Sequence, residues 1–359
     1  MKIGLILPGT IWYAPYVRIY TRVLQENNVE HQIISWNRDG KDAKEGIQYE
    51  ENIHVNNGSA SFSAYRRYIA FIKKVVKENG FDRLIVFGPQ MTCLLSSFLM
   101  RKFKGRFVID YRDLSIEQKP GLRQLFALMT KVSYANVISS PGFMRCLPKR
   151  DYFLSHNFDV DAVKKAIGLR DAKGFGSSDN IDVLTIGGIR DFSSNVEVVK
   201  ALANEKGFTV RFVGRGGGAT QLAAYCDEHK IENVSFEGFY QKHEEAGYVQ
   251  SSTFMNIFYP RVITHDTALS NRFYNSLIYR KPMIVTKDTI QGDYAEKYNV
   301  GVALVDCSDL KNALKTFIQQ DYNVYAERCD NLLHEFLQDQ ERFEKLVCEF
   351  VKGLIRSKM

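Results

Sequence analysis

The sequence predicts an α/β protein made of two doubly wound, Rossmann-like domains that face each other across a cleft. Short apolar runs alternate with helix-like stretches, which is typical of parallel strands covered on both faces by helices. The alternation runs twice, and a stretch rich in Gly, Ser and polar residues, 173–180, separates the two series. The length of 359 residues also corresponds to two domains of ordinary size.

Each series is read from its apolar runs and its turn residues. In the first series we expect strands over 2–9, 29–36, 82–88, 106–111 and 136–140, and helices over 16–27, 63–78, 94–101 and 122–134. In the second series we expect strands over 181–188, 208–214, 233–238, 255–260, 282–286 and 302–305. The expected helices of that series are 195–204, 220–229, 272–279 and 324–355.

Composition argues against several other classes of protein. Hydrophobic residues make up 45% and charged residues 25%, as in globular rather than disordered chains. The longest apolar stretch, 84–100, contains Gly-Pro-Gln and falls short of the ~20 residues of a membrane helix, and we expect no secretory signal before the strand-like IGLIL. The six cysteines form no C-x-x-C pair, so we expect free thiols in a reducing cytoplasm and no metal site.

Charge is distributed unevenly along the chain. The net charge is +7, but residues 1–165 carry 25 basic and 15 acidic side chains, whereas the remainder carries 23 basic and 26 acidic ones. The excess lies in Arg66, Arg67, Lys73, Lys74, Lys77, Arg101, Lys102, Lys104 and Arg106. Such a face attracts anionic lipid or phosphorylated substrates, or it is simply a solvated helix surface. No nucleic-acid-binding motif accompanies it, so we expect no nucleic-acid partner.

Two glycine-rich loops follow strand-like runs of the second series. Gly187-Gly188-Ile189-Arg190 allows close backbone approach to a phosphate that the arginine can bridge, unless it is an ordinary turn. Gly214-Arg215-Gly216-Gly217-Gly218 precedes a helix-like stretch, as a phosphate-cradling loop does. Glu237 follows about twenty residues later, where a dinucleotide enzyme carries its ribose-binding acid.

Polar clusters follow other strands. Asp110-Tyr111-Arg112-Asp113 offers carboxylates for a general base, or Arg112 neutralises two structural carboxylates. His265-Asp266-Thr267 lies in an expected irregular stretch, and both a structural and a catalytic role remain open for the histidine. Asp159-Val160-Asp161 precedes a helical AVKKAI, so we interpret Asp159 as an N-cap rather than a metal ligand.

Taken in order, the segments of the second half resemble bacterial GT-B glycosyltransferases of family 4, which build surface polysaccharides. The segments are VLTIGGIRD, FTVRFVGRGGG, NVSFEGFY, LSNRFYNSLIYRKPMIV and GVALVDCSDLKNAL. In the first half VIDYRDL, SSPGFM and LSHNFDVDAV resemble the acceptor-side loop, a turn and the hinge of that family. The resemblance implies an acceptor-side domain over 1–165, a linker over 166–180, a nucleotide-sugar-binding domain over 181–325, and C-terminal helices over 326–359 that cross back.

The resemblance also implies roles for individual residues. Donor binding falls to Gly187, Gly188, Arg190, Gly214, Arg215, Tyr240, Asn271, Arg272 and Asn275. The acceptor-side residues are Gly9, Thr10 and Arg112, and the catalytic candidates are Asp110, Asp113 and Asp266.

The sequence departs from the family pattern at several positions. Thr267 and Asn275 replace the family's Glu-x7-Glu pair, so Asp266 would substitute for the first glutamate and Asn275 would bind the ribose. Asn195 stands where the family carries a pyrophosphate-binding lysine, and the Asp110–Asp113 cluster replaces the acceptor-side histidine.

The activity implied is transfer of a sugar, by a metal-independent hexosyltransferase-like enzyme without a cofactor. The donor is a nucleoside-diphosphate sugar, and the acceptor is a hydroxyl of a glycan or lipid-linked glycan in surface polysaccharide biosynthesis. The location implied is the cytoplasm, with an anionic membrane surface as a further partner of the basic face. The alternatives are a catalytically degenerate binding subunit, a nucleotide-sugar epimerase and an NAD-type oxidoreductase that uses GRGGG and Glu237.

Overall fold

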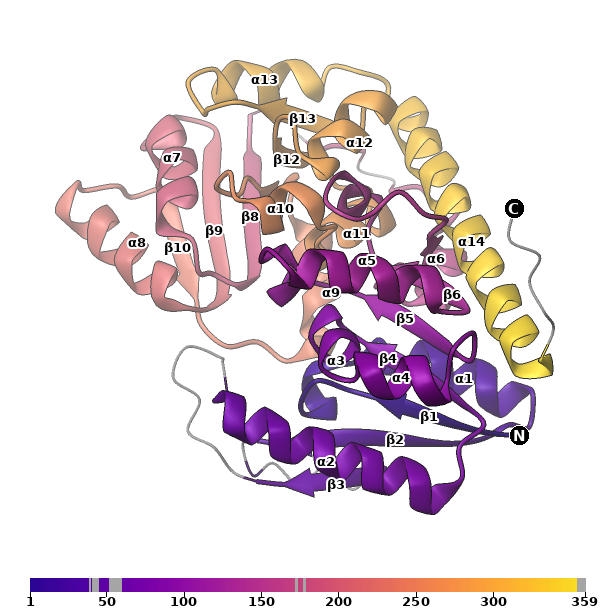
Figure 1. Ribbon diagram of the computed structural model, residues 1–359. Helices are drawn as coiled ribbons and strands as arrows, with labels where there is room; N and C mark the ends of the chain where they lie inside the picture. The colour runs from indigo at the N-terminus through magenta and orange to yellow at the C-terminus, as the bar shows by residue number, and fades with distance from the viewer. Residues whose placement is uncertain (39, 41–44, 52–59, 172–173, 177–178, 354–359) are drawn as a thin grey trace. The chain divides into compact units, whose positions relative to one another are not determined.

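The computed structural model describes residues 1–38, 40, 45–51, 60–171, 174–176 and 179–353. The chain divides into two compact units: unit 1 is Met1–Asn157 with Gln338–Met359, and unit 2 is Phe158–Leu337. Each unit contains one parallel sheet with helices packed on it, which confirms the predicted α/β class (Figure 1). The division at Asn157 precedes the boundary at residue 165 implied by the resemblance. Residues 172–173 and 177–178 of the expected linker lie outside the described residues.

Unit 1 has a seven-stranded sheet with the strand order β3-β2-β1-β4-β5-β6-β7. All of its neighbouring strands pair in parallel; Ile6 of β1, for example, lies opposite Ile34 of β2 and Val86 of β4. The strands are β1 Lys2–Ile6, β2 Glu30–Asn37, β3 Ile47–Glu50, β4 Arg83–Phe87, β5 Phe107–Tyr111, β6 Ala135–Ile138 and β7 Phe153–Leu154. Chain order reverses between β1 and β4, which is where a doubly wound sheet opens a crevice at its carboxyl edge.

Helices cover both faces of this sheet. Its helices are η1 Ile11–Tyr13, α1 Val17–Glu26, α2 Phe62–Asn79, α3 Pro89–Leu94, α4 Ser96–Lys102, η3 Ile116–Gln118, α5 Leu122–Val132 and η4 Pro141–Arg145. Helix α1 and the end of the last helix pack on one face, and α2 to α5 lie over the other (Figure 1). Helix α2 begins where the Ser61 hydroxyl accepts a hydrogen bond from the Ala64 amide and ends at Gly80, whose φ is +61°.

Unit 2 has a six-stranded parallel sheet with the order β10-β9-β8-β11-β12-β13. Its strands are β8 Ile181–Gly188, β9 Phe208–Arg215, β10 Val234–Glu237, β11 Phe254–Ile257, β12 Met283–Thr286 and β13 Gly301–Leu304. Its helices are α6 Val160–Ala166, α7 Phe192–Leu202, α8 Gly217–Glu228, η5 Lys242–Glu244, α9 Glu245–Ser251, α10 Ile263–Thr267, α11 Asn271–Ile278, α12 Ile290–Tyr298 and α13 Leu310–Phe317. Helix α14, Tyr322–Lys352, begins in unit 2 and continues past Leu337 into the C-terminal segment of unit 1. The order reverses between β8 and β11.

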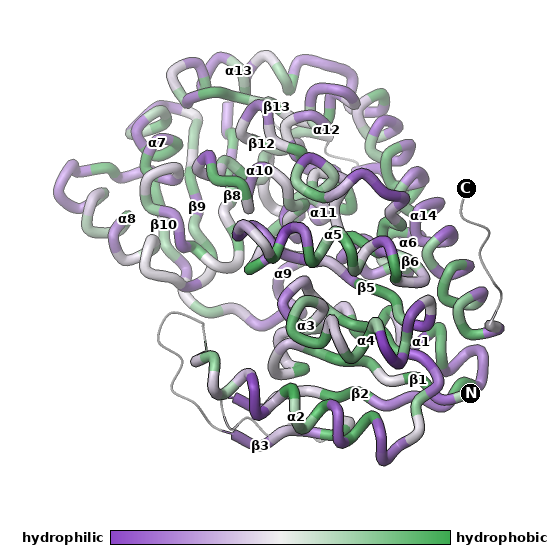
Figure 2. Tube along the Cα trace, viewed as in Figure 1, coloured by the Kyte–Doolittle hydropathy of each residue, from purple (hydrophilic) through white to green (hydrophobic). Residues whose placement is uncertain are grey.

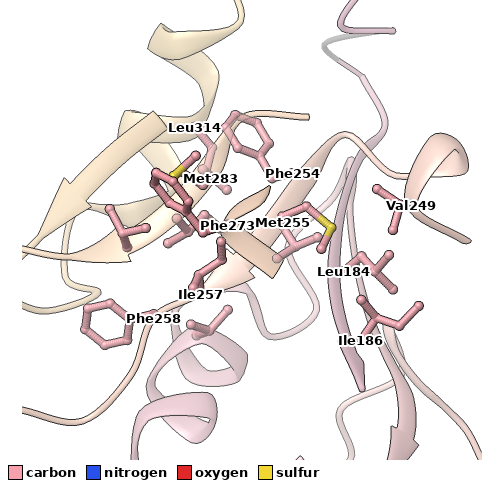
Figure 3. Close-up of a cluster of buried hydrophobic side chains, with 14 of the residues drawn as sticks. Leu184, Ile186, Val249, Phe254, Met255, Ile257, Phe258, Phe273, Met283 and Leu314 are labelled. Atoms are coloured by element: carbon pink, nitrogen blue, oxygen red, sulfur yellow. The ribbon is translucent and has the colours of Figure 1, made fainter. Parts of the chain in front are cut away.

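The core of unit 2 forms around its central strands. Side chains of β8, β11 and β12 meet Phe273 of α11, Leu314 of α13 and Val249 of α9 (Figure 3). Burying a large apolar side chain stabilises a fold by about 1.5–3 kcal/mol, so this cluster is the main support of the strand ends described below.

Helix α14 contributes to the cores of both units. Phe336 lies in the core of unit 2, while Phe343, Leu346, Val347 and Phe350 lie in the core of unit 1. The sequence places Phe336, Phe343, Leu346, Val347, Phe350 and Leu354 on one stripe of the final helix, which predicts core packing. The first five are buried, which confirms the prediction for them. Figure 2 shows the helix changing between polar and apolar residues along its length. Leu354, also assigned to the stripe, lies outside the described residues.

Several local predictions need correction. The expected helix over 94–101 is two helices, because α3 already begins at Pro89, directly after Gly88 with φ +82°. Short edge strands β3 and β7, and helices α9, α12 and α13, were not predicted. The stretch around His265 is the short helix α10 rather than irregular. By contrast, the predicted N-cap is confirmed, because the Asp159 carboxylate accepts hydrogen bonds from the amides of Asp161 and Ala162 at 2.9 and 3.1 Å.

Candidate functional site

A pocket of about 340 Å³ opens in unit 2 at the carboxyl ends of β8 and β11. This is the position at which the strand order reverses, where open α/β sheets bind their ligands. The pocket is lined by Ile186, Gly187, Gly188, Arg190, Asp191, Tyr240, Glu245, Tyr259, His265, Ala268, Ser270, Asn271, Arg272, Asn275 and Gln291. Seven of the nine predicted donor-binding residues are therefore brought together by the fold.

One end of the pocket carries an uncompensated positive charge. Arg272, on the first turn of α11, is only 8% exposed. Its Nε donates to the Ile186 carbonyl at 2.5 Å and its Nη2 to the Gly188 carbonyl at 2.9 Å. No carboxylate oxygen lies within 4.0 Å of this guanidinium among residues 1–353 as far as they are described. Two carbonyl dipoles fix the group without neutralising it, an arrangement that is chemically suited to bind an anion.

The loop after β8 completes this end. Gly187 has φ +99°, a conformation that favours glycine. Gly188 leaves room for the Arg190 side chain, because a Cβ added at Gly188 would lie 3.6 Å from the Arg190 Nε. Arg190 is exposed and forms no ion pair within the described part of the chain. Helix α7 starts directly after this loop and α11 starts at Asn271, so two helix N-termini contribute residues to the pocket.

The other end of the pocket carries a carboxylate held by three donors. Glu245, the first residue of α9, accepts hydrogen bonds from the Tyr240 hydroxyl at 2.9 Å, Asn275 Nδ2 at 2.9 Å and Lys242 Nζ at 2.5 Å. Burial alone would raise the pKa of Glu245, but these donors outweigh it and hold the pKa below its usual value. Burial and the hydrogen bond to Glu245 raise the pKa of Tyr240, so the phenol stays protonated and donates.

His265 also lines the pocket. Its Nδ1 is 3.2 Å from the Pro260 carbonyl, and its ring centre is 4.9 Å from that of Tyr259. A nitrogen facing a carbonyl carries the proton, so Nε2 is the acceptor of the neutral ring. The side chain therefore offers the pocket a hydrogen-bonding group beside the ring of Tyr259.

Three residues expected near the donor have other partners in the structure. Asp266 does not line the pocket; it pairs with Arg261, Nε to Oδ1 at 3.0 Å. The Thr267 hydroxyl donates to the Ile263 carbonyl at 2.7 Å, and the side chain is buried. Asn195 is also buried and accepts a hydrogen bond from Asn256 at 3.0 Å. None of the three lines this pocket.

The second glycine-rich loop does not line it either. A Cβ at Gly214, where φ is +131°, would lie 2.0 Å from the Gly187 carbonyl oxygen. A Cβ at Gly216 would lie 2.1 Å from the Ile189 carbonyl oxygen. These glycines therefore let β9 pack against the end of β8. Arg215 instead lies 5.3 Å from the ring centre of the exposed Phe239, and Glu237 is exposed outside the pocket.

On unit 1, the predicted acceptor-side cluster is neutralised internally. Asp110 is fully buried, and Arg112 contacts both of its oxygens, Nε to Oδ1 at 2.6 Å and Nη2 to Oδ2 at 2.9 Å. Tyr20 donates a further hydrogen bond to Asp110 at 2.6 Å, and Arg112 also donates to the Ser155 carbonyl at 2.9 Å. The interpretation in which Arg112 neutralises a structural carboxylate thus fits Asp110.

Asp113 differs from its neighbour because it reaches the surface. Protein atoms around its carboxyl displace water and raise its pKa, an effect that the charge of Arg112 partly opposes.

In the loop after β1, the Thr10 hydroxyl is buried and donates to the Trp36 carbonyl at 3.1 Å. Gly9 lies beside the Arg38 guanidinium, whose Cζ would be 3.6 Å from an added Cβ.

Two further findings concern what the described residues lack. No three His, Cys, Asp or Glu side chains among them are grouped so that they could hold a metal ion. Within the same residues, every helix is too short or too polar to span a bilayer.

Comparison with known proteins identifies the fold. No protein-family model matches the chain, and no curated protein matches it. Solved structures match over nearly its whole length. Sucrose-phosphate synthase from Thermosynechococcus elongatus has a TM-score of 0.69 at 14% identity, covering 98% of both chains. Anabaena Alr3699/HepE, in complex with UDP and glucose, has a TM-score of 0.66 at 14% identity, covering 99% of this chain and 100% of that one.

A third match is WaaG, a glycosyltransferase involved in lipopolysaccharide biosynthesis, with a TM-score of 0.60 at 14% identity over 96% of this chain and 99% of that one. The chain has the GT-B fold. Identities this low establish the GT-B fold alone. The same fold is found in a UDP-GlcNAc 2-epimerase from Methanocaldococcus jannaschii, with a TM-score of 0.56 at 12% identity over 94% and 100% of the two chains, so it supports more than one chemistry.

Some residues that line the pocket of unit 2 were not predicted from the sequence. Glu245, Gln291 and Ser270 were not singled out. Gln291 Oε1 accepts from the Ser270 amide and hydroxyl at 3.1 and 2.7 Å, which ties α12 to the start of α11. Gln241 and Glu244 form a capping box just before Glu245. This sequence pattern indicates that a helix starts there, but it does not indicate that Glu245 lines a pocket.

Substitution of Gly214 by alanine tests whether the second loop serves packing. The added Cβ would clash with the Gly187 carbonyl, so we expect the free energy of unfolding to fall by about 2 kcal/mol or more, measured by urea denaturation followed by circular dichroism.

Gly217→Ala is the matched control in the same loop. A Cβ at Gly217 meets nothing within 4 Å and the residue begins α8, so alanine should stabilise by up to about 1 kcal/mol. A stable Gly214→Ala protein would contradict the packing role.

Proposed function

We propose that the protein is a glycosyltransferase that uses a nucleoside-diphosphate sugar. The observation that carries this proposal is Arg272, a nearly buried guanidinium that lines the pocket at the strand-order reversal without a carboxylate partner among the described residues. A diphosphate supplies the missing negative charge, and its oxygens match the geometry of guanidinium and backbone N–H donors.

The donor is proposed to bind along the pocket from its cationic to its anionic end. Arg190, Arg272 and the backbone of Gly187 and Gly188 would hold the diphosphate, and the base would lie toward Tyr240. Charge builds on the diphosphate as the glycosidic bond breaks, so two arginines stabilise the transition state more than the ground state. This cationic pair motivates the proposal that a hexosyl group is transferred without a divalent metal.

The acceptor is proposed to be a hydroxyl of a glycan or lipid-linked glycan in surface polysaccharide biosynthesis. For an inverting reaction, Asp113 is the proposed general base, because the residue is exposed and burial of its carboxyl raises its pKa above the usual value. Asp110 is proposed to be a positioning residue, because it acts through Arg112 and has no surface exposure.

A catalytically degenerate binding subunit is the second candidate. Thr267 and Asn275 in place of two glutamates favour it, since Thr267 brings no charge and its hydroxyl is bonded to the backbone. Purified protein that binds UDP or GDP but neither transfers nor hydrolyses any sugar nucleotide would support this candidate. A product with an altered sugar configuration, still attached to the nucleotide, would instead indicate an epimerase.

A thermal-shift screen against UDP, GDP, CMP and dTDP sugars tests the proposed function directly. A ligand at 100 times its dissociation constant stabilises the folded protein by about 2.7 kcal/mol. Because the pocket binds through charge and backbone donors, we expect stabilisation by at least one sugar nucleotide and by its free nucleoside diphosphate.

Arg272→Met tests the residue that carries the proposal. Loss of a charged hydrogen-bond donor to phosphate is worth about 1.5–3 kcal/mol, so we expect nucleotide affinity and kcat/KM to fall by about 10- to 100-fold. Isothermal titration calorimetry with the nucleotide identified in the screen measures the affinity.

Arg261→Met is the matched control, since Arg261 lies nearby, is exposed and pairs with Asp266 outside the pocket. Equal losses in the two variants would contradict the assignment. Arg272→Lys keeps a charge but loses the planar fork, so partial recovery would separate charge from geometry.

The pH profile tests Asp113. A base must be deprotonated, so kcat/KM should decline as the pH falls through the pKa of Asp113. Because this pKa is raised, the decline should begin at a higher pH than it would for an ordinary aspartate. Asp113→Asn should abolish inverting transfer but leave donor binding unchanged. An unaltered profile, or a retained anomeric configuration by NMR, would exclude the role.

The basic face is proposed to bind anionic lipid. It comprises Arg66, Arg67, Lys73, Lys74, Lys77, Arg101, Lys102, Lys104 and Arg106, on α2, α4 and the residues after α4. All of these except the half-buried Lys73 are exposed; Arg67 pairs with Glu51, and Lys74 lies 3.9 Å from Glu78. Each basic residue near an anionic lipid surface contributes about 1 kcal/mol to the free energy of membrane binding. We therefore expect most of the protein to sediment with phosphatidylserine vesicles at low salt and less of it at high salt. Binding unaffected by salt or by lipid charge would contradict it.

A further inference from the structure

The carboxylate of Glu245 forms a polar end of the pocket that the phosphate-binding role does not explain. Its side chain is 15% exposed and reaches the pocket from α9, a helix that carries none of the predicted donor-binding residues. Lys242 pairs with this carboxylate at 2.5 Å, but the lysine is 82% exposed, so water screens the pair. The carboxylate would still weaken phosphate binding unless the two charges meet different parts of one ligand.

We propose that Glu245 binds the two adjacent hydroxyls of the donor's ribose, and that the pocket thereby selects ribonucleotides over 2′-deoxyribonucleotides. This inference rests on the proposed function. It assigns the hydroxyl-binding carboxylate to a residue of α9 rather than to α11, where Asn275 stands.

Hydrogen-bonding capacity supports this assignment. An ionised carboxylate has about four acceptor positions and no donor. In the described part of the chain, Asn275 and Lys242 both donate to Oε1, and Oε2 accepts from Tyr240 alone. Lys242 is 82% exposed, so it does not seal the group from a ligand. The carboxylate therefore retains acceptor capacity, and a pair of adjacent hydroxyls supplies two donors.

Tyr240 links the two ends of the pocket. Its hydroxyl oxygen would lie 3.9 Å from a Cβ at Gly187 and donates to Glu245 at 2.9 Å. Arg272 lies close enough to Tyr240 to act on its phenol electrostatically. A ligand with its phosphate against Gly187 and Arg272 thus meets Glu245 a few ångströms further on, the order in which a nucleotide presents its diphosphate and ribose.

The protonation states agree with this role. Its donors hold the pKa of Glu245 below the usual value, so it is an acceptor at neutral pH, and Tyr240 remains a donor. A site whose polar groups are arranged for hydroxyls discriminates against an analogue that lacks one of them. Removal of the 2′-hydroxyl takes away one of the two donors that the carboxylate is placed to accept.

Calorimetric titration tests the inference with nucleotide pairs. UDP, GDP, ADP and CDP are each compared with their 2′-deoxy counterparts, and inorganic pyrophosphate serves as a probe of the cationic end alone. For the wild-type protein we expect the 2′-deoxy form to bind about tenfold more weakly, because one hydrogen bond to a charged group is lost.

Two variants separate the hydroxyl role from a structural one. Glu245→Gln keeps the shape and removes the charge, and Glu245→Ala removes the acceptor altogether. In both we expect weaker ribonucleotide binding, a ribose-to-deoxyribose ratio near one, and pyrophosphate affinity that is unchanged or higher. Retained pyrophosphate binding also demonstrates that the variants are folded at the site.

Glu237→Gln is the matched control, because Glu237 is an exposed carboxylate at the end of β10 and lies outside the pocket. Its discrimination should equal that of the wild type. Equal wild-type binding of ribo and deoxy forms, discrimination that survives in Glu245→Ala, or loss in Glu237→Gln instead would each overturn the inference while leaving the proposed function in place. A wild-type protein that binds neither pyrophosphate nor any nucleotide would refute the proposed function itself.

Discussion

The site depends on one interaction: the guanidinium of Arg272 donates hydrogen bonds to two carbonyl groups at the end of β8. These hydrogen bonds fix α11 against the strand and replace part of the water that burial removes from the charge. They do not supply a negative charge, and an uncompensated buried cation is costly. Among the described residues nothing neutralises this charge at the strand-order reversal, and this is the property on which the proposed binding of an anionic donor rests.

Close packing of glycines sets where that strand end lies. Gly214 approaches the Gly187 carbonyl so closely that any side chain there would clash, which lets β9 run alongside β8 to its last residues. The same run of glycines was interpreted from the sequence as a phosphate-binding loop. Both uses require glycine for the same steric reason, so spacing alone cannot distinguish a backbone neighbour from a phosphate. Only the fold reveals which of the two occupies the space.

The sequence predicted the central strands well because each is a continuous apolar run, as at Ile181–Gly188, whereas edge strands such as Phe153–Leu154 are too short to give a pattern. Arg272 and Asn275 were predicted because their segment resembles the donor-binding helix of the family, and their spacing of three places them on one helix face, a local property. Glu245 was not, since it meets Asn275 only through the tertiary fold. Asp266 was misleading for the same reason, because its pairing with Arg261 is invisible in the order of residues.

Two arginines at strand ends illustrate why residue type does not locate a ligand. Arg112 and Arg272 are equally buried. Arg112 directly follows strand β5, and Arg272 faces the end of strand β8. Asp110 contacts the first through both oxygens, and Tyr20 completes that cluster, so its charge is balanced within the protein. Within the described residues, the Arg272 guanidinium donates to two carbonyl oxygens and lies 5.6 Å from the ring centre of Tyr259, and it has no carboxylate partner there. A balanced ion pair gains little from a further anion, whereas a cation without a carboxylate partner among the described residues gains much. The proposed donor site therefore rests on Arg272 rather than on Arg112.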